Sequence, residues 1–195
     1  QTMHDTIPNF AGAPTIRSLK SGNWSSATAG SLGRVPTAAD VVGITGGTVV
    51  TVDTTAAVAA TIGVESAGKL VFRTDISTRL TVGTLLVLPQ GTLEVGTAAT
   101  PVAPTVTAEI VIADVPLDLT DDGIGIYDPR QFGTSLLAVD AKVSMSGAVK
   151  TPFVRLASEP KPGDLTLTLS AAVSGWSVGD VVVLPDSRHV PYAQR

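Results

Sequence analysis

Three glycines, spaced almost evenly along the chain, constrain its fold more than any other feature. Gly46, Gly68 and Gly91 lie 22 and 23 residues apart, and short apolar runs flank each of them. The residues four positions before and after these glycines are all apolar: Val42 and Val50, Val64 and Phe72, Val87 and Val95. Short apolar segments bounded by glycine turns indicate β-strands. Their recurrence at a nearly fixed period indicates a structural repeat.

A strand, a glycine turn and a second strand, repeated every 22–23 residues, predict a β-solenoid, in which each rung buries its inward side chains by stacking on its neighbours. The spacing continues to Asp114, with Ile110 four residues before it. After an insertion it reaches Ala141, flanked by Leu137 and Met145. A β-sandwich is the alternative, because it also has short strands and frequent turns. The solenoid is favoured because equivalent positions carry the same class of side chain.

The composition argues against several classes of partner. The formal net charge is −4 and no run of Lys or Arg occurs, so nucleic acid is not an expected partner. The longest apolar runs, at residues 85–89 and 181–185, are far too short to cross a bilayer, so this segment is not expected to insert into a membrane. The chain has no Cys, which excludes disulfides and zinc–cysteine sites.

The order of several motifs resembles that of a known family. The segments "SGNWSS", "GRVPTAADVVGITGGTVVTVD", "GKLVF", "LLVLPQGTLEVGT" and "EIVI" follow one another as in the G-eight domain, which is named for its eight glycines. The later segments "DPRQFGTSLL", "VSMSGAVKTPFVRL" and "GWSVGDVVVLPDS" resemble the part that usually continues this domain. The family includes hyaluronan-binding and hyaluronan-depolymerising proteins, fibrocystin and large bacterial surface proteins. The resemblance implies a right-handed parallel β-helix in an extracellular or cell-surface protein of bacterial type.

The resemblance also implies that the chain is the opening section of a longer multidomain protein. It divides the chain into an N-terminal arm or cap (1–20), a G-eight-like β-helix (21–188) and a C-terminal tail (189–195). In a late rung, Val181 and Val183 are expected to point inward after a turn at Gly179 and Asp180, and Val178, just before this turn, is a further inward candidate. Asp180 is also a weak functional candidate.

An acidic loop supplies the candidate metal site. Asp118, Asp121 and Asp122 lie within five residues of one another in the segment that interrupts the rungs. Calcium prefers several converging oxygen ligands, and these carboxylates would supply three. The spacing does not match an EF-hand loop, so an acidic turn without metal is the alternative. No other cofactor is expected.

Four titratable residues are weak catalytic candidates: Asp75, Asp128, Asp186 and His189. Glycoside hydrolysis uses two carboxyl groups across the scissile bond, and Asp75 would belong to such a pair on an outer face. The favoured alternative is a solvated turn in which Asp75 pairs with a neighbouring arginine, Arg73 or Arg79. His189 would be a general base oriented by Asp186, and a surface histidine in the tail is the favoured alternative.

Aromatic side chains are the candidate ligand-binding residues, because their faces suit the apolar faces of sugar rings. Trp24, Tyr127 and Trp176 are the candidates, with Tyr192 as a further aromatic near the end of the chain. Trp24 is expected to be the more exposed tryptophan, whereas Trp176 is expected to cover an edge of the aliphatic stack.

Three functions are consistent with these features. The favoured one is a non-catalytic structural or carbohydrate-interaction module of a secreted or surface protein, with a polysaccharide or glycan as its partner. The alternative is part of a polysaccharide-cleaving enzyme whose cleft needs downstream rungs. The third is end-to-end self-association through unpaired strand edges.

Overall fold

The computed structural model describes residues 8–117, 128 and 133–185. Contacts divide the chain into two units, Gln1–Ala148 and Val149–Arg195, which are described separately below. All the regular secondary structure in the described residues is β-strand, which confirms the predicted all-β class. The same residues contain no helix long and apolar enough to cross a membrane.

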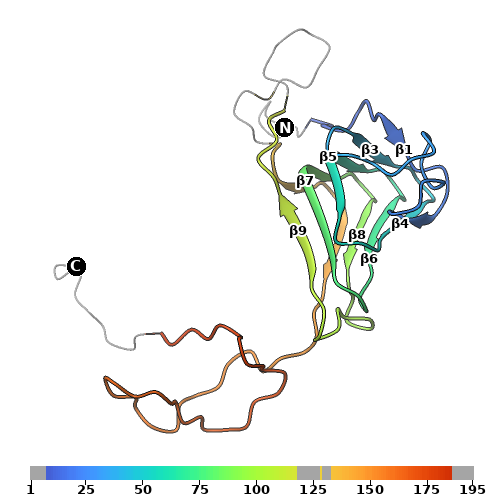
Figure 1. Cartoon of the computed structure of the whole chain (residues 1–195). Helices are drawn as coiled ribbons and strands as arrows, with labels where there is room; N and C mark the ends of the chain where they lie inside the picture. The colour runs from blue at the N-terminus through green and yellow to red at the C-terminus, as the bar shows by residue number, and fades with distance from the viewer. Residues whose placement is uncertain (1–7, 118–127, 129–132, 186–195) are drawn as a thin grey trace. The chain divides into compact units, whose positions relative to one another are not determined.

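The strands of the first unit form two sheets (Figure 1). The first sheet has the order β1-β3-β5-β7-β10, with β9 also paired to β7, and the second has the order β2-β4-β6-β8-β11. The first-sheet strands are β1 (Ile16–Arg17), β3 (Val41–Ile44), β5 (Ala57–Val64), β7 (Thr78–Val87), β9 (Ala108–Ile112) and β10 (Leu136–Ala138). The second-sheet strands are β2 (Gly22–Asn23), β4 (Val49–Val52), β6 (Lys69–Phe72), β8 (Thr92–Val95) and β11 (Lys142–Met145).

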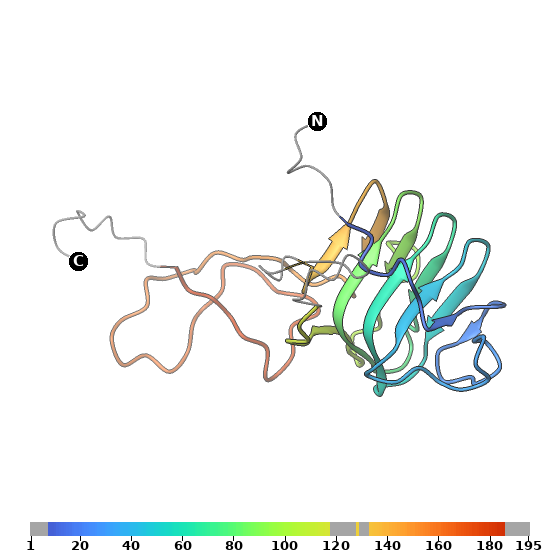
Figure 2. The same ribbon diagram turned by 90° about the horizontal axis from the view of Figure 1, so that it is seen from above.

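Every pairing between these strands is parallel. From β3 to β8, consecutive strands alternate between the two sheets, so each rung contributes one strand to each sheet. Figure 2 shows the successive rungs side by side. Parallel pairing argues against the β-sandwich alternative, because sandwiches are built from antiparallel sheets.

The pairing register corrects the first step of the predicted repeat. Ile44 pairs with Val64, a step of 20 residues, and Val64 pairs with Val87, a step of 23 residues. The predicted 23-residue step is therefore confirmed. The predicted 22-residue step, which placed Val42 opposite Val64, is wrong by two residues because it matched glycine to glycine rather than backbone conformation to backbone conformation.

The turns between the two sheets stack through a column of residues with left-handed backbone conformation. The column consists of Gly47 (φ 80°), Ala67 (φ 60°), Gln90 (φ 64°) and Asp140 (φ 46°). Each of the first three donates its backbone N–H to the carbonyl oxygen of the next, at 3.1, 3.2 and 2.9 Å. Glycine tolerates this conformation best, yet only the first of these turns has glycine at the left-handed position. A search for recurring glycine therefore misses the column.

All three predicted turn glycines are required by close backbone approach. A Cβ atom at Gly46 would lie 2.6 Å from the Ser66 carbonyl oxygen. A Cβ atom at Gly68 would lie 2.6 Å from the Ile44 carbonyl oxygen, and one at Gly91 would lie 2.7 Å from the Val64 carbonyl oxygen. Gly46, Gly68 and Gly91 all lie between strands, as predicted.

The fourth predicted rung is wrong. Its leading strand, β9, pairs with the first half of β7, so Ile110 lies opposite Leu80. Ile110 therefore does not continue the column of register partners that ends with Val64 and Val87. The step is 30 residues because residues 96–107 form a long excursion before β9.

The column of Val87 continues instead in β10, where Ala138 is its partner. The sequence placed Leu137 there, one residue away. In the second sheet Met145 pairs with Val95, as the repeat predicts. The rung therefore resumes after the insertion with a one-residue shift in its first strand.

Aliphatic side chains from both sheets fill the space between them. In β4 and β8 buried and half-exposed residues alternate, as expected for strands with one face on a core. Phe72 is the largest fully buried side chain, and Leu70 and Leu93 are fully buried beside it. The core also includes Ile44, Val52, Ile62, Val64, Leu80, Val82, Leu85 and Val87.

The segment before β1 packs across the outer face of the first sheet (Figure 2). Phe10 and Ala11 are buried, and a Cβ atom added at Gly63 in β5 would lie 2.5 Å from the Cβ of Ala11. A Cβ atom at Gly43 in β3 would lie 3.1 Å from Pro14. Residues 8–15, which we call the N-terminal strap, therefore pack closely against the first sheet because Gly43 and Gly63 have no side chains there.

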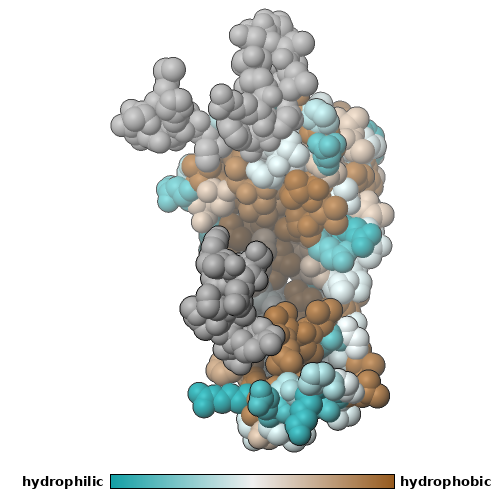
Figure 3. All heavy atoms as spheres, turned by 90° about the vertical axis from the view of Figure 1, so that its left-hand side faces the viewer, coloured by the Kyte–Doolittle hydropathy of each residue, from teal (hydrophilic) through white to brown (hydrophobic). Residues whose placement is uncertain are grey.

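The last rung of the first unit is more exposed than the others. Ile112, Val143 and Met145 are exposed, although their register partners in β7 and β8 are buried. Figure 3, which views the molecule from the side on which β9 lies, shows hydrophobic atoms at the surface. The outer edge of β1 differs, because Ser18 bridges Gly30 and Ser31 donates its backbone N–H to Arg17 at 2.8 Å.

The second unit has no strand in its described part, residues 149–185, and has one isolated bridge, between Leu156 and Leu169. Val178, Val181 and Val183 are 109%, 93% and 82% exposed. The prediction that they point inward is therefore wrong. A β-solenoid rung buries its inward residues only against a neighbouring rung, and none covers these valines within the described part of this unit.

Candidate functional site

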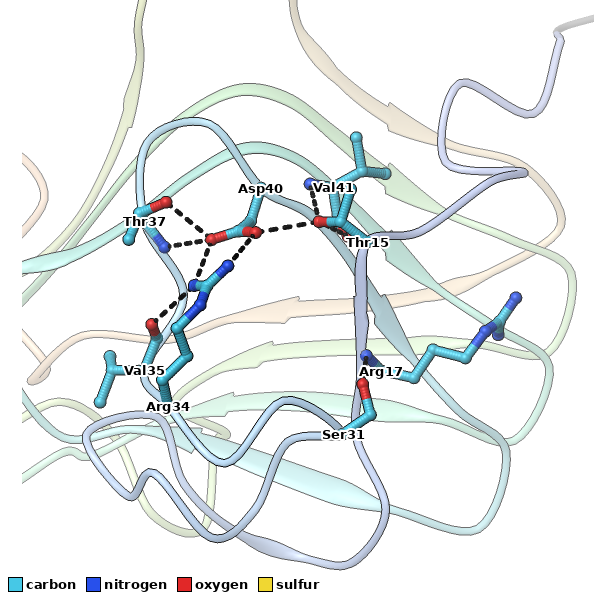
Figure 4. A network of polar contacts seen from close by, with 8 residues as sticks. All are labelled: Thr15, Arg17, Ser31, Arg34, Val35, Thr37, Asp40 and Val41. Atoms are coloured by element: carbon cyan, nitrogen blue, oxygen red, sulfur yellow. Dashed lines mark hydrogen bonds and ion pairs between the residues drawn. The ribbon is translucent and has the colours of Figure 1, made fainter.

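A buried carboxylate, that of Asp40, lies at the centre of a network of polar contacts in the first unit (Figure 4). Arg34 binds Asp40 through two nitrogens, with Nη1 2.7 Å from Oδ2 and Nη2 2.8 Å from Oδ1. Thr37 donates its backbone N–H and its hydroxyl to Oδ2, both at 2.7 Å. The Thr15 hydroxyl donates to Oδ1 at 3.0 Å. Five hydrogen bonds therefore converge on one carboxyl group.

These contacts hold the pKa of Asp40 far below its ordinary value. The hydrogen bonds from Arg34 contribute most, and those from Thr37 and Thr15 add to them, while burial of the group opposes the shift. Asp40 therefore stays ionised and cannot act as a general acid near neutral pH. It joins the loop before β3 to the end of the N-terminal strap, which is a structural role.

The sequence analysis did not identify Asp40. A signal was present in "RVPTAAD", because in the pattern Ser/Thr-x-x-acid the acidic side chain typically bonds back to the backbone N–H of the Ser or Thr. The partner Thr15 lies 25 residues away, and no local pattern indicates it.

The structure corrects the expectation for Trp24. Its side chain is only 3% exposed and belongs to the hydrophobic core. Its backbone N–H donates to Thr51 at 2.7 Å, which fixes it beside β4. A cavity of about 30 Å³ lies next to it, with Ile16, Ala29 and Val42 among its walls. A buried indole offers no open face to a sugar ring, so Trp24 packs at the β1–β2 end of the core instead.

Asp75 forms an ion pair with Arg73, whose Nε lies 2.7 Å from Oδ1 and whose Nη2 contacts Oδ2. These hydrogen bonds lower the pKa of Asp75. Arg79 pairs instead with Glu109, Nε to Oε2 at 2.6 Å. The pairing agrees with the solvated-turn alternative for Asp75.

Asp128 is buried, and its Oδ2 accepts a hydrogen bond from the Gly133 backbone N–H at 2.6 Å. The other members of the acidic loop and of the tail lie outside the described residues: Asp118, Asp121, Asp122, Tyr127, Asp186, His189 and Tyr192. In the part of the chain that the structure does describe, no three His, Asp or Glu side chains gather as metal ligands would.

A groove of about 630 Å³ lies in the second unit. Its apolar walls include Trp176, Phe153 and the run Val181–Val183, and its polar residues include Lys150 and Asp180. The Lys150 ammonium lies 2.9 and 2.8 Å from the two Asp180 oxygens. Of the candidate functional residues that the structure describes, Trp176 and Asp180 are the two that lie together around an open space.

Trp176 is fixed within this groove. Its Nε1–H donates to the Thr151 carbonyl oxygen at 2.7 Å. Val181 and Val183 are exposed, so the described part of this unit holds no aliphatic stack of the kind that Trp176 was expected to cover. The backbones of Thr151 and Ser174 are joined by a hydrogen bond of 2.9 Å, and Ser174 N–H also donates to the Thr151 hydroxyl at 2.8 Å. The sequence predicted Trp176 from its residue type, but nothing in the sequence predicted Lys150 as its neighbour.

Together the parallel strand pairing, the alternation between two sheets and the stacked turns define an all-β protein built from repeated strand–turn–strand rungs. The family model of the G8 domain matches residues 23–157, more than half of the chain. The chain therefore belongs to the G8 domain family, as its motifs indicated. No curated protein and no solved structure matches it.

Proposed function

We propose that this chain is a non-catalytic structural and carbohydrate-interaction module of a secreted or cell-surface protein, with its rungs wound as a right-handed parallel β-helix. The observation that carries the proposal is the alternation of consecutive parallel strands between two sheets, which is the arrangement expected of a coil that stacks rung on rung. Family membership supports the extracellular location, because the G8 domain is typical of extracellular proteins. The groove beside Trp176 supports contact with a glycan.

The partners of three described acids support a non-catalytic role for those residues. Asp40, Asp75 and Asp180 are each bonded to a basic side chain, and these bonds lower the pKa of all three carboxyl groups. A glycosidase needs one carboxylic acid that stays protonated near its working pH, beside a second carboxylate. These three groups do not supply the protonated partner.

A glycan array combined with a reducing-end assay on the full chain tests this function. Binding without release of reducing ends is the expected result. Release of reducing ends that disappears on Asp75→Asn or Asp128→Asn would overturn it in favour of the polysaccharide-cleaving alternative.

The exposed last rung supports a second candidate function, self-association through strand edges. In the described residues nothing pairs with the outer edges of β10 and β11, and Val143 and Met145 are exposed there. The β1 edge is bridged by Gly30. Association through the β10 and β11 edges alone would join two chains rather than build a filament. Light scattering tests this: a dimer at high concentration is expected, and either a monomer or a long assembly would contradict it.

A further inference from the structure

The groove in the second unit combines an aromatic face with hydrogen-bonding groups of both kinds. Trp176 and Phe153 line it, and Phe153 is 78% exposed. Lys150 and Asp180 also line the groove, and both side chains are partly accessible to solvent. The volume of about 630 Å³ lies within the range of about 300–1,000 Å³ that is usual for small-ligand sites.

We propose that this groove binds a pyranose unit of a glycan, with the Trp176 ring as the stacking platform and the Lys150–Asp180 pair as the groups that bind its hydroxyls. The inference rests on the proposed function and names the site that would perform it.

The platform is held in place before any ligand arrives. The Trp176 indole donates to the Thr151 carbonyl oxygen, and Gly175 precedes it with φ 75°. A Cβ atom at Gly175 would lie 2.8 Å from the Val149 carbonyl oxygen, so glycine permits the close approach of the two segments. A preformed aromatic surface loses little conformational freedom on binding, which favours affinity.

The charged pair matches the chemistry of sugar hydroxyls, which both donate and accept hydrogen bonds. An ammonium group has three donor hydrogens, and a carboxylate has about four acceptor positions. Asp180 uses part of this capacity on Lys150 and on the Ser177 backbone N–H at 2.8 Å. The remaining capacity lies beside the aromatic wall, where adjacent hydroxyls of one ring would reach both groups.

A proline-rich peptide is the other occupant that an aromatic groove suits. Proline has no N–H, so such a peptide presents mainly acceptor carbonyls. The indole N–H of Trp176 is already bonded to Thr151, and the Asp180 carboxylate accepts but does not donate. A sugar hydroxyl can donate a hydrogen bond to the Asp180 carboxylate, whereas a proline-rich peptide has few backbone donors to offer it.

The test is a titration of the ¹⁵N-labelled full chain with cellotetraose, chitotetraose and decaproline, observed by NMR. The chain has two indole N–H signals, from Trp24 and Trp176, and Trp24→Phe assigns them. A tetrasaccharide is expected to shift the Trp176 signal in a saturable way and to leave the buried Trp24 signal unchanged. Trp176→Ala is expected to weaken binding at least tenfold, and Asp180→Asn several-fold.

The controls separate this inference from the proposed function. Trp24→Phe changes the other tryptophan and is expected to leave affinity unchanged. If oligosaccharides bind the wild-type chain but Trp176→Ala binds them equally well, the site assignment is overturned while the proposed function stands. If decaproline alone shifts the Trp176 signal, the groove is a peptide site and the inference is overturned. If the array and the titration show no glycan binding at all, both proposals fail.

Discussion

Asp40 shows how one side chain joins segments that are distant in sequence. Its carboxylate receives hydrogen bonds from the loop before β3 and from Thr15 at the end of the N-terminal strap. An ionised group is stable in a buried position only when its hydrogen bonds are satisfied. Asp40 meets this condition with Arg34 and two threonines, so we assign it a structural role rather than a catalytic one.

Asp40→Asn is expected to lower the free energy of unfolding by at least about 2 kcal/mol at pH 7, because the amide cannot accept all five hydrogen bonds. The pKa of Asp40 is lower in the folded state than in the unfolded chain. Its contribution is therefore complete above the unfolded pKa of about 3.9 and is lost as the pH falls below it.

Urea unfolding at pH 7, 5 and 2.5 measures this contribution. The difference between wild type and Asp40→Asn should be similar at pH 7 and 5 and clearly smaller at pH 2.5. An equal difference at all three values would contradict the assignment. Asp75→Asn is the matched control, because its ion pair is exposed and is expected to contribute little at any pH.

Ala67 occupies a left-handed position that glycine adopts more readily. Ala67→Gly is expected to stabilise the protein by about 0.5–1 kcal/mol, since relief of the left-handed strain exceeds the added flexibility of the unfolded chain. Ala60→Gly, in the interior of β5, is the control and is expected to destabilise it. Chemical denaturation measures both, and a loss of stability in both variants would contradict the argument.

At the scale of elements, the N-terminal strap can pack on the first sheet because Gly63 has no side chain. Gly63→Ala would place a methyl group 2.5 Å from the Ala11 Cβ, so the strap is expected to lift from the first sheet. Limited proteolysis should then cut within residues 8–15 much faster than in wild type. Gly147→Ala is the control, because nothing lies within 4 Å of its added Cβ.

A second change distinguishes displacement from general damage. Adding Ala11→Gly to Gly63→Ala removes the clash and should restore protection of the strap. Cleavage that stays fast in the double variant would show that Gly63 acts in some other way.

The sequence predicts these elements where the cause is local. The alternation of valines predicts strands, and the step from Val64 to Val87 is confirmed because Gly68 and Gly91 are each the last residue of a four-residue turn, whereas Gly46 is the second residue of its turn. The first step fails because the left-handed turn position holds Gly47, Ala67 and Gln90, which share a conformation but no residue type. The burial of Trp24 also depends on packing between distant segments, so the exposure expected from its residue type alone was wrong. Of the candidate site, the sequence supplied Trp176 and Asp180, while Lys150 required the fold.

At the scale of the whole molecule, the central claim is that successive rungs of this G8 domain stack in parallel and in one register. That register determines which core side chains stack on one another, which turn residues form the left-handed column, and which glycines of the first sheet lie under the strap. Because the chain has no cysteine, pairs of introduced cysteines report on it without interference.

The most direct measurement is disulfide formation between two outward positions of neighbouring strands. Thr51 in β4 pairs with Val71 in β6, and paired residues of adjacent strands lie about 4.8 Å apart, within the span of a disulfide. Thr51→Cys/Val71→Cys is therefore predicted to cross-link rapidly on mild oxidation, whereas Thr51→Cys/Arg73→Cys, the pair that a 22-residue step would align, is predicted to stay reduced. Rapid cross-linking of the second pair but not of the first would contradict the account.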